Sequence, residues 1–259
     1  MRGTLVICAD YESLSREAAR RFASAAEATG RRPFRVALSG GGTPRRLYEL
    51  LATGEFERRI PWERVHLFWG DERMVPHDHA QSNYKLARES LLKHVRIPPK
   101  NIHPVPVSLP LEQAATQYEQ ELRRQFGRRW GFPEFDLVLL GLGDDGHTAS
   151  LFLRAPALQE KQRWVTTHQP PHLPGRITLT LPVLNAARRV LFLVSGENKA
   201  TALRLALESS GHLPAQLVNP SKGELLWLAD SAAAGKLKGL RVELVPTGVN
   251  EPVVSKAEP

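Results

Sequence analysis

Cysteine and long apolar runs are almost absent from this sequence of 259 residues, and their scarcity excludes two classes of protein. The one cysteine, Cys8, lies in a short apolar run, so a disulfide framework is excluded and Cys8 is expected in the core. No stretch of 18 or more apolar residues is present, so no membrane-spanning helix is predicted. The N-terminal residues MRGTLVICADYESL lack the apolar core and cleavage site of a secretory signal. We therefore expect a cytoplasmic protein without a membrane partner.

Acidic residues are the minority charge, since 27 Asp and Glu face 35 Lys and Arg and leave a net charge of +8. Such a surplus fits either nucleic acid or small anionic substrates. The basic residues form scattered pairs rather than one stripe with interleaved aromatic residues: Arg31-Arg32, Arg45-Arg46, Arg58-Arg59, Arg123-Arg124, Arg128-Arg129 and Arg188-Arg189. We assign these pairs to solvated helix faces and predict no nucleic-acid partner. A sugar-phosphate sensor or a nucleic-acid binder is the non-enzymatic alternative.

Strand-like runs alternate with helix-like runs along the chain, and no internal repeat is visible. The predicted strands are Leu5–Ala9, Phe34–Leu38, Val65–Trp69, Asp136–Leu142, Ile177–Leu181, Val190–Val194 and Glu224–Leu228. The predicted helices are Ser13–Thr29, Pro44–Ala52, Asn83–His94, Leu111–Arg129 and Glu197–Glu208. Ser13 and Ser82 are the expected N-caps of the first and third helices.

Two of these strands, DLVLLGL and VLFLV, are apolar throughout, which is typical of a parallel sheet covered on both faces. Strands separated by helices form right-handed βαβ units. We therefore predict a single α/β domain over residues 1–248, with an open, mostly parallel Rossmann-like sheet and helices on both faces. Residues 249–259 are expected to form a flexible C-terminal tail. Ligands of such sheets bind at the carboxyl ends of the strands, so the loops there are the candidate site.

The first candidate loop is SGGGTP, residues 39–44, between a predicted strand and a predicted helix. Glycines let backbone amides approach an anion, and Pro44 suits the first turn of a helix. The helix start adds unpaired N–H groups and partial positive charge, and the Ser39 and Thr43 hydroxyls add donors. The loop matches neither the P-loop nor the G-x-G-x-x-G pattern. We predict a phosphate cradle; a plain flexible turn is the alternative.

The second candidate loop carries Asp71, Glu72 and Arg73 just past a buried strand. Arg73 is suited to clamp a phosphate oxygen, and Asp71 to bind sugar hydroxyls or to move protons. The alternative is an ion pair among neighbouring surface charges. Residues 77–79, His-Asp-His, resemble part of a metal cluster, but no second ligand pair follows, so no metal site is predicted.

The third candidate loop, LLGLGDDGHTASLF, presents Asp144, Asp145 and His147 at the end of an apolar strand. Imidazole titrates near neutral pH and is the usual general base, and an adjacent carboxylate orients it and fixes its tautomer. Thr148 and Ser150 begin a predicted short helix whose amides are suited to hold an oxyanion. A structural or exposed histidine is the alternative.

These loops and a later segment resemble, in the same order, the sequence blocks of the 6-phosphogluconolactonases, a family related to the glucosamine-6-phosphate deaminases. The blocks are SGGGTP, DER followed by VPHDHAQSNY, LLGLGDDGHTASLF, and RITLTLPVLNAARRVLFLVSGENKATAL. The resemblance covers nearly the whole chain and implies the modified Rossmann-like sheet of that family. It also implies a phosphorylated sugar lactone as substrate.

The resemblance implies a role for each candidate residue. His147 would activate water, with Asp145 beside it. The residues that would hold or line the phosphate site are Ser39, Gly40, Gly41, Gly42, Thr43, Arg73, Lys199 and Arg176. The family's catalytic block more often has proline where Asp144 stands and Pro-x-Gly after the Phe, where Leu153 and Arg154 follow here. We expect the carboxylate of Asp144 to raise the basicity of His147.

Two positions favour a lactonase over a deaminase. The deaminases carry Tyr where Arg73 stands, and a glutamate five residues after the histidine, where this chain has Phe152. The resemblance therefore implies hydrolysis of 6-phospho-D-glucono-1,5-lactone to 6-phosphogluconate, a step of the oxidative pentose phosphate pathway. No metal or other cofactor is expected, and the enzyme would be a monomer or a small homo-oligomer. A glucosamine-6-phosphate deaminase/isomerase is the alternative.

Overall fold

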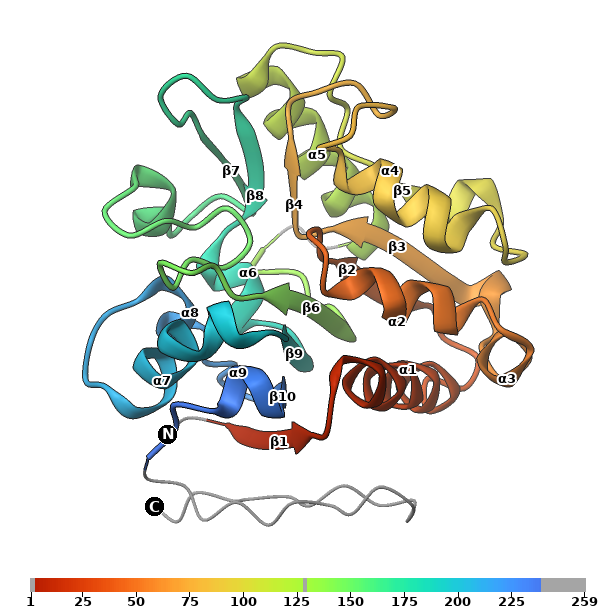
Figure 1. Ribbon diagram of the computed structural model, residues 1–259. Coiled ribbons are helices and arrows are strands. Elements are labelled where there is room, and N and C mark those ends of the chain that lie inside the picture. Colours follow the sequence, from red (N-terminus) through yellow and green to blue (C-terminus); the bar gives the residue numbers. More distant parts are fainter. Residues whose placement is uncertain (1–2, 128–129, 239–259) are drawn as a thin grey trace.

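The computed structural model describes residues 3–127 and 130–238, so the predicted C-terminal tail and the Arg128-Arg129 pair lie outside the described residues. Its main element is a seven-stranded sheet (Figure 1). The strand order is β1 (Thr4–Cys8), β10 (Glu224–Asp230), β9 (Arg189–Val194), β6 (Leu137–Gly141), β2 (Phe34–Leu38), β3 (Val65–Trp69) and β5 (Ile102–His103). Every adjacent pair in this sheet is parallel. The predicted open, mostly parallel α/β sheet is confirmed.

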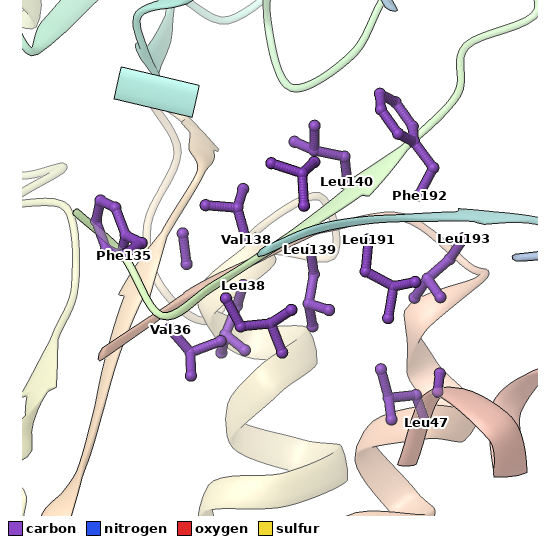
Figure 2. Close-up of a cluster of buried hydrophobic side chains, with 14 of the residues drawn as sticks. Val36, Leu38, Leu47, Phe135, Val138, Leu139, Leu140, Leu191, Phe192 and Leu193 are labelled. Carbon is purple, nitrogen blue, oxygen red and sulfur yellow. The ribbon is translucent and has the colours of Figure 1, made fainter. Parts of the chain in front are cut away.

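The core occupies both faces of this sheet. Successive residues of a strand point to opposite faces, and in the central strands the residues on both faces are apolar. Figure 2 shows Val138 and Leu140 of β6 on one face and Leu139 on the other, where Leu47 of α2 approaches. The helices are α1 (Tyr11–Glu27), α2 (Pro44–Leu51), α3 (Gly54–Glu57), α4 (Asn83–Ala87), α5 (Leu111–Phe126), α6 (Leu181–Asn185), α7 (Ala200–Glu208), α8 (Pro214–Leu217) and α9 (Ser231–Ala234). None of the described helices has the length and apolar character needed to cross a bilayer.

The helix boundaries follow from their capping groups. The prediction of Ser13 as the first N-cap was wrong, because Asp10 accepts the hydrogen bond of the Ser13 amide at 2.7 Å and α1 starts at Tyr11. Ser82 is confirmed as the N-cap of α4, since its hydroxyl accepts from the Lys85 amide at 3.1 Å. The helix predicted there runs on from α4 into a π-helical turn over Arg88–Leu92.

A second, three-stranded sheet was not predicted. It consists of β4 (Asp71–Arg73), β8 (Arg176–Leu179) and β7 (Val165–His168), paired antiparallel. We expected the DER segment in a loop and the strand near residue 177 in the main sheet. Instead, β4 starts two residues after β3 ends and pairs with β8, which sets Arg73 opposite Arg176. Figure 1 shows this sheet standing beside the main sheet.

The remaining composition-based predictions concern Cys8 and the basic pairs. Cys8 is buried in the core as predicted, and burial raises the pKa of its thiol to about 12. Of the described basic pairs, Arg45-Arg46 and Arg123-Arg124 lie in helices as predicted, whereas Arg31-Arg32, Arg58-Arg59 and Arg188-Arg189 lie in turns or at a strand start, so the assignment of these three pairs to helix faces was wrong. Several members form ion pairs with glutamates: Arg46 with Glu12, Arg59 with Glu27, Arg123 with Glu119, Arg124 with Glu121 and Arg188 with Glu134.

Candidate active site

A cavity of about 350 Å³ lies where β2, β3, β6 and β9 end, and it brings the three candidate loops together. Every predicted site residue except Asp145 lines it. Its lining consists of Ser39, Gly40, Gly41, Gly42, Thr43, Pro44, Asp71, Arg73, Asn83, Gly141, Leu142, Gly143, His147, Thr148, Ala149, Arg176, Ser195, Asn198 and Lys199. Residues more than 150 positions apart in the sequence therefore share one cavity at the sheet edge that the fold class predicts for ligands.

Residues 39–44, here called the glycine loop, leave room and donors for an anion. Gly41 has a φ of +87°, and a Cβ on Gly41 or Gly42 would meet no atom within 4 Å. In the described part of the chain, the amides of Gly41, Gly42 and Thr43 donate no hydrogen bond. The loop leads directly into the N-terminus of α2, and the partial positive charge of that helix end also favours an anion at the loop. These features support the predicted phosphate cradle.

Asn83 ties the glycine loop to the second loop, and the sequence analysis did not identify it as a site residue. A Cβ on Gly40 would lie 1.9 Å from Asn83 Oδ1, so only glycine permits this approach. The Asn83 side-chain amide donates to the Asp71 carbonyl at 2.8 Å. The available signal was its place in the VPHDHAQSNY segment, one of the sequence blocks that carry the family resemblance.

Asp71 and Glu72 have separate roles. Asp71 is 7% exposed and lines the cavity, and its Oδ2 accepts from the Ser150 hydroxyl at 2.7 Å. Glu72 is turned away and buried, and it accepts from the backbone amides of Asn83 and Tyr84, each at 2.8 Å. Burial raises the pKa of Glu72 despite these hydrogen bonds. Of the three charged residues in the second candidate loop, Asp71 and Arg73 therefore line the cavity and Glu72 does not.

Arg73 and Arg176 form a pair of cations at the cavity wall. They are register partners across β4 and β8, and the Nε of each is buried without a hydrogen-bond partner among the described residues. Burial and the charge of Arg73 lower the pKa of Arg176, against the opposing effect of Asp71. Two adjacent guanidinium groups with unused donors are suited to an anion that accepts bidentate hydrogen bonds.

His147 lies on the third loop, here called the histidine loop (residues 141–152). Its Nδ1 lies 2.5 Å from Asp145 Oδ1, and its backbone amide donates to the same oxygen at 3.1 Å. Burial raises the pKa of Asp145, but the hydrogen bonds from His147 outweigh it and hold the pKa below its usual range. When Nδ1 carries the proton toward the carboxylate, Nε2 is the basic nitrogen. The Phe152 ring covers the imidazole, with 4.3 Å between ring centroids.

The predicted short helix after His147 was wrong. Residues 148–151 form a tight turn, in which the Leu151 amide donates to the Thr148 carbonyl at 2.9 Å and Ala149 has a φ of +48°. The turn is held because the Thr148 hydroxyl donates to the Gly141 carbonyl at 2.8 Å and Ser150 reaches Asp71. Thr148 and Ser150 therefore fasten the histidine loop instead of starting a helix.

The His-Asp-His segment does not gather a metal site among the described residues, where no group of three potential ligands is found. The His77 ring instead donates to the Val105 carbonyl at 3.0 Å and stacks on Tyr84 with 4.3 Å between ring centroids.

Asp144 contacts Lys199, not His147. Its Oδ1 lies 2.6 Å from the Lys199 ammonium and accepts from the Asn198 amide at 3.2 Å. Asn198 and Lys199 belong to a short turn before α7 that starts at Gly196, whose amide donates to Asp230 at 3.1 Å. The expected direct effect of Asp144 on the basicity of His147 has no contact to carry it.

The chain is similar to known proteins over most of its length. The family model of glucosamine-6-phosphate isomerases/6-phosphogluconolactonase matches residues 9–227. A 6-phosphogluconolactonase of Synechocystis sp. is 48% identical over 208 residues, which is 78% of this chain and 84% of the relative. A probable 6-phosphogluconolactonase 1 of Arabidopsis thaliana is 39% identical over 255 residues, 91% and 94% of the two chains. The solved 6-phosphogluconolactonase from Trypanosoma cruzi aligns with a TM-score of 0.80 at 30% identity, covering 91% of this chain and 97% of that one.

Proposed function

Because the chain belongs to the family of glucosamine-6-phosphate isomerases and 6-phosphogluconolactonases, we propose that its cavity hydrolyses 6-phospho-D-glucono-1,5-lactone with His147 as the general base. The enzyme class is lactone hydrolase, since curated relatives at 46% and 48% identity are 6-phosphogluconolactonases. The observation that carries the assignment of His147 is its place in the cavity: Asp145 occupies Nδ1, and no described group hydrogen-bonds Nε2.

The substrate phosphate is assigned to the positive end of the cavity. The amides of Gly41, Gly42 and Thr43 supply free donors, and the N-terminus of α2 adds partial positive charge. The first amides of α2 itself are already paired, since Arg45 donates to the Gly42 carbonyl and Arg46 to the Tyr11 hydroxyl, each at 3.2 Å. Arg73 and Arg176 supply guanidinium groups, and Lys199 supplies a third cation. A phosphoryl group anchored there fixes one end of the sugar, so that the lactone carbonyl at its other end is presented to His147.

The proposed chemistry needs one proton shuttle. Nε2 of His147 takes a proton from water as the water oxygen bonds to C1, and Asp145 stabilises the imidazolium that forms. The positive lining of the cavity stabilises the negative charge on the carbonyl oxygen. The bond between C1 and the ring oxygen then breaks, and the imidazolium returns its proton to that oxygen, which becomes the C5 hydroxyl. The product acid loses its own proton to solvent.

The deaminase alternative finds less support at two positions. Phe152 contacts the imidazole through an apolar ring, so no carboxylate is available there to relay protons for ring opening. At the position where the deaminases carry Tyr, this chain has Arg73, and its cationic side chain lines the cavity. Release of ammonia from glucosamine 6-phosphate by the purified protein would contradict the proposal.

The test is a coupled assay that generates the lactone by oxidation of glucose 6-phosphate and subtracts its spontaneous hydrolysis. His147→Gln is expected to lower kcat by about 10²- to 10⁴-fold, because a general base contributes about that much. Arg73→Ala is expected to raise KM more than it lowers kcat, since it removes binding shared by ground and transition states. His212→Gln, at an exposed histidine outside the cavity, is the matched control. Wild-type kcat in the His147 variant would remove His147 from the mechanism.

A further inference from the structure

One ion pair joins the two loops on either side of the cavity. Asp144 belongs to the histidine loop, and Lys199 belongs to the turn before α7, yet their charged atoms lie 2.6 Å apart. Asn198 donates to the same carboxylate oxygen. Lys199 and Asn198 line the cavity, whereas Asp144 does not. A cation of the phosphate site is therefore bound to a carboxylate of the chain itself.

This ion pair is easily exchanged for another. The Asp144 side chain is 67% exposed and that of Lys199 is 22% exposed, so solvent screens their attraction and the pair adds little to stability. The lysine ammonium is a compact charge on a flexible stem with three donors, and it can turn toward a new acceptor without a change of backbone. The histidine loop is fastened separately by Thr148 and Ser150, so release of Asp144 does not release the loop.

We propose that Asp144 is a specificity-determining residue that occupies Lys199 until a phosphate dianion displaces it, an inference that rests on the proposed function of this cavity. A ligand must then replace a carboxylate to recruit the third cation. A phosphate ester carries close to two negative charges at pH 7 and succeeds in this exchange, whereas a singly charged ligand is no better than the carboxylate it replaces. Asp144 thereby lowers the affinity for every anion, but lowers it most for weakly charged ones.

The test is direct binding of 6-phosphogluconate and of gluconate, measured by titration calorimetry at pH 7.5 to wild type and Asp144→Asn. Asparagine keeps the shape and the acceptor oxygen but removes the charge. We expect 6-phosphogluconate to bind the variant about threefold to fivefold more tightly, which is the scale of an exposed ion pair. The preference for 6-phosphogluconate over gluconate should fall at the same time, because the affinity for the singly charged gluconate should rise by the larger factor.

Two further variants test whether Asp144 affects the affinity through its contact with Lys199. Glu197→Gln removes an equal negative charge from the turn that carries Lys199. Glu197 is exposed and forms no ion pair among the described residues, so this change should alter the affinity by less than about twofold. In a Lys199→Gln background, Asp144→Asn should no longer tighten binding. Equal or weaker binding by Asp144→Asn, or a gain that persists without Lys199, would overturn the proposal.

Binding and turnover separate this proposal from the proposed function. Calorimetry needs no turnover, so a wild type that binds 6-phosphogluconate but hydrolyses no lactone would contradict the function and still decide the role of Asp144. Normal lactonase activity with unchanged affinity in Asp144→Asn would contradict only the role of Asp144.

Discussion

At the scale of single residues, the geometry of the proposed base depends on the missing side chain of Gly143. A Cβ there would lie 2.0 Å from Nδ1 of His147 and 2.7 Å from Oδ1 of Asp145. Both distances are far below van der Waals contact, so a methyl group cannot coexist with the imidazole and carboxylate in their present positions. Gly146 of the same histidine loop is required for a different reason: its φ is +82°, a backbone conformation that residues with a side chain rarely adopt.

We predict that Gly143→Ala lowers kcat by about tenfold to a hundredfold, because displacement of the imidazole by about 1 Å misaligns the attack. The KM should change less, since the residues proposed to bind the substrate phosphate lie on other loops. Steady-state kinetics of the lactone reaction measures both constants. Gly54→Ala is the control, because its Cβ would meet only the end of the Arg58 side chain, at 3.9 Å. A Gly143→Ala enzyme as active as wild type would show that His147 need not keep this position.

The sequence predicted which loops meet in the cavity and that Asp145 lies beside His147, but it did not predict that Asp144 pairs with Lys199. Residue type and position at strand ends identified His147, Arg73 and the glycine loop, and the structure places them in one cavity. The sequence offered two adjacent aspartates before His147. Which one contacts the imidazole depends on the Gly143–Gly146 turn, and the partner of the other depends on a turn over 50 residues later.

At the scale of elements, Glu72 joins the second sheet to α4. The carboxylate accepts from three backbone amides, those of Arg73, Asn83 and Tyr84, each at 2.8 Å, and from the Ser82 hydroxyl at 3.3 Å. Two of these amides are among the first of α4, which have no partner within the helix. Glu72 therefore fixes where α4 begins, and with it the position of Asn83 beside Gly40.

We predict that Glu72→Ala lowers the free energy of unfolding by about 2–4 kcal/mol, because it leaves buried amides without an acceptor. Urea denaturation followed by circular dichroism measures this loss. Glu89→Ala, at an exposed residue of the following turn, should change it by less than about 0.5 kcal/mol. A Glu72→Ala protein within the range of that control would mean that water replaces the carboxylate.

Six of the seven strands of the main sheet were predictable because they carry a strong local signal, whereas the two-residue strand β5 and the second sheet were not predicted. β2 and β3 are apolar or nearly so, and their predicted bounds coincide with the observed ones. β4 and β8 have three and four residues, and β4 reads as a charged segment. Their pairing comes from contacts between segments a hundred residues apart, which no local pattern reports.

At the scale of the whole molecule, three buried or partly buried histidines outside the cavity share one electrostatic property. His66, His77 and His103 all have lowered pKa values, mainly because burial disfavours the charged imidazole, and that of His66 falls to about 4. The His66 and His103 rings stack, with Nδ1 of one 3.1 Å from Nε2 of the other, and Glu121 accepts from His103 at 2.8 Å. The folded protein therefore holds these rings neutral.

Acid is consequently expected to destabilise the fold well above the range in which carboxylates titrate. A histidine in the unfolded chain has a pKa of about 6.5, whereas these folded rings have lower pKa values. Below pH 6.5 the unfolded chain therefore binds more protons than the folded protein, which favours unfolding. The loss begins near pH 6.5 and grows until folded His66 is itself protonated near pH 4. After allowance for solvent screening at this half-buried ring, His66 alone should contribute about 1–2 kcal/mol.

Unfolding free energies between pH 7.5 and 4.5 test this expectation, provided that general charge repulsion is separated from burial. The net charge of +8 also grows in acid, but 0.5 M NaCl screens repulsion among surface charges and leaves the cost of burying a charged ring. The slope of stability against pH should therefore persist at high salt and become shallower in His66→Gln, while His212→Gln should leave it unchanged. A slope that vanishes in salt would assign acid sensitivity to the surface charge instead of the buried histidines.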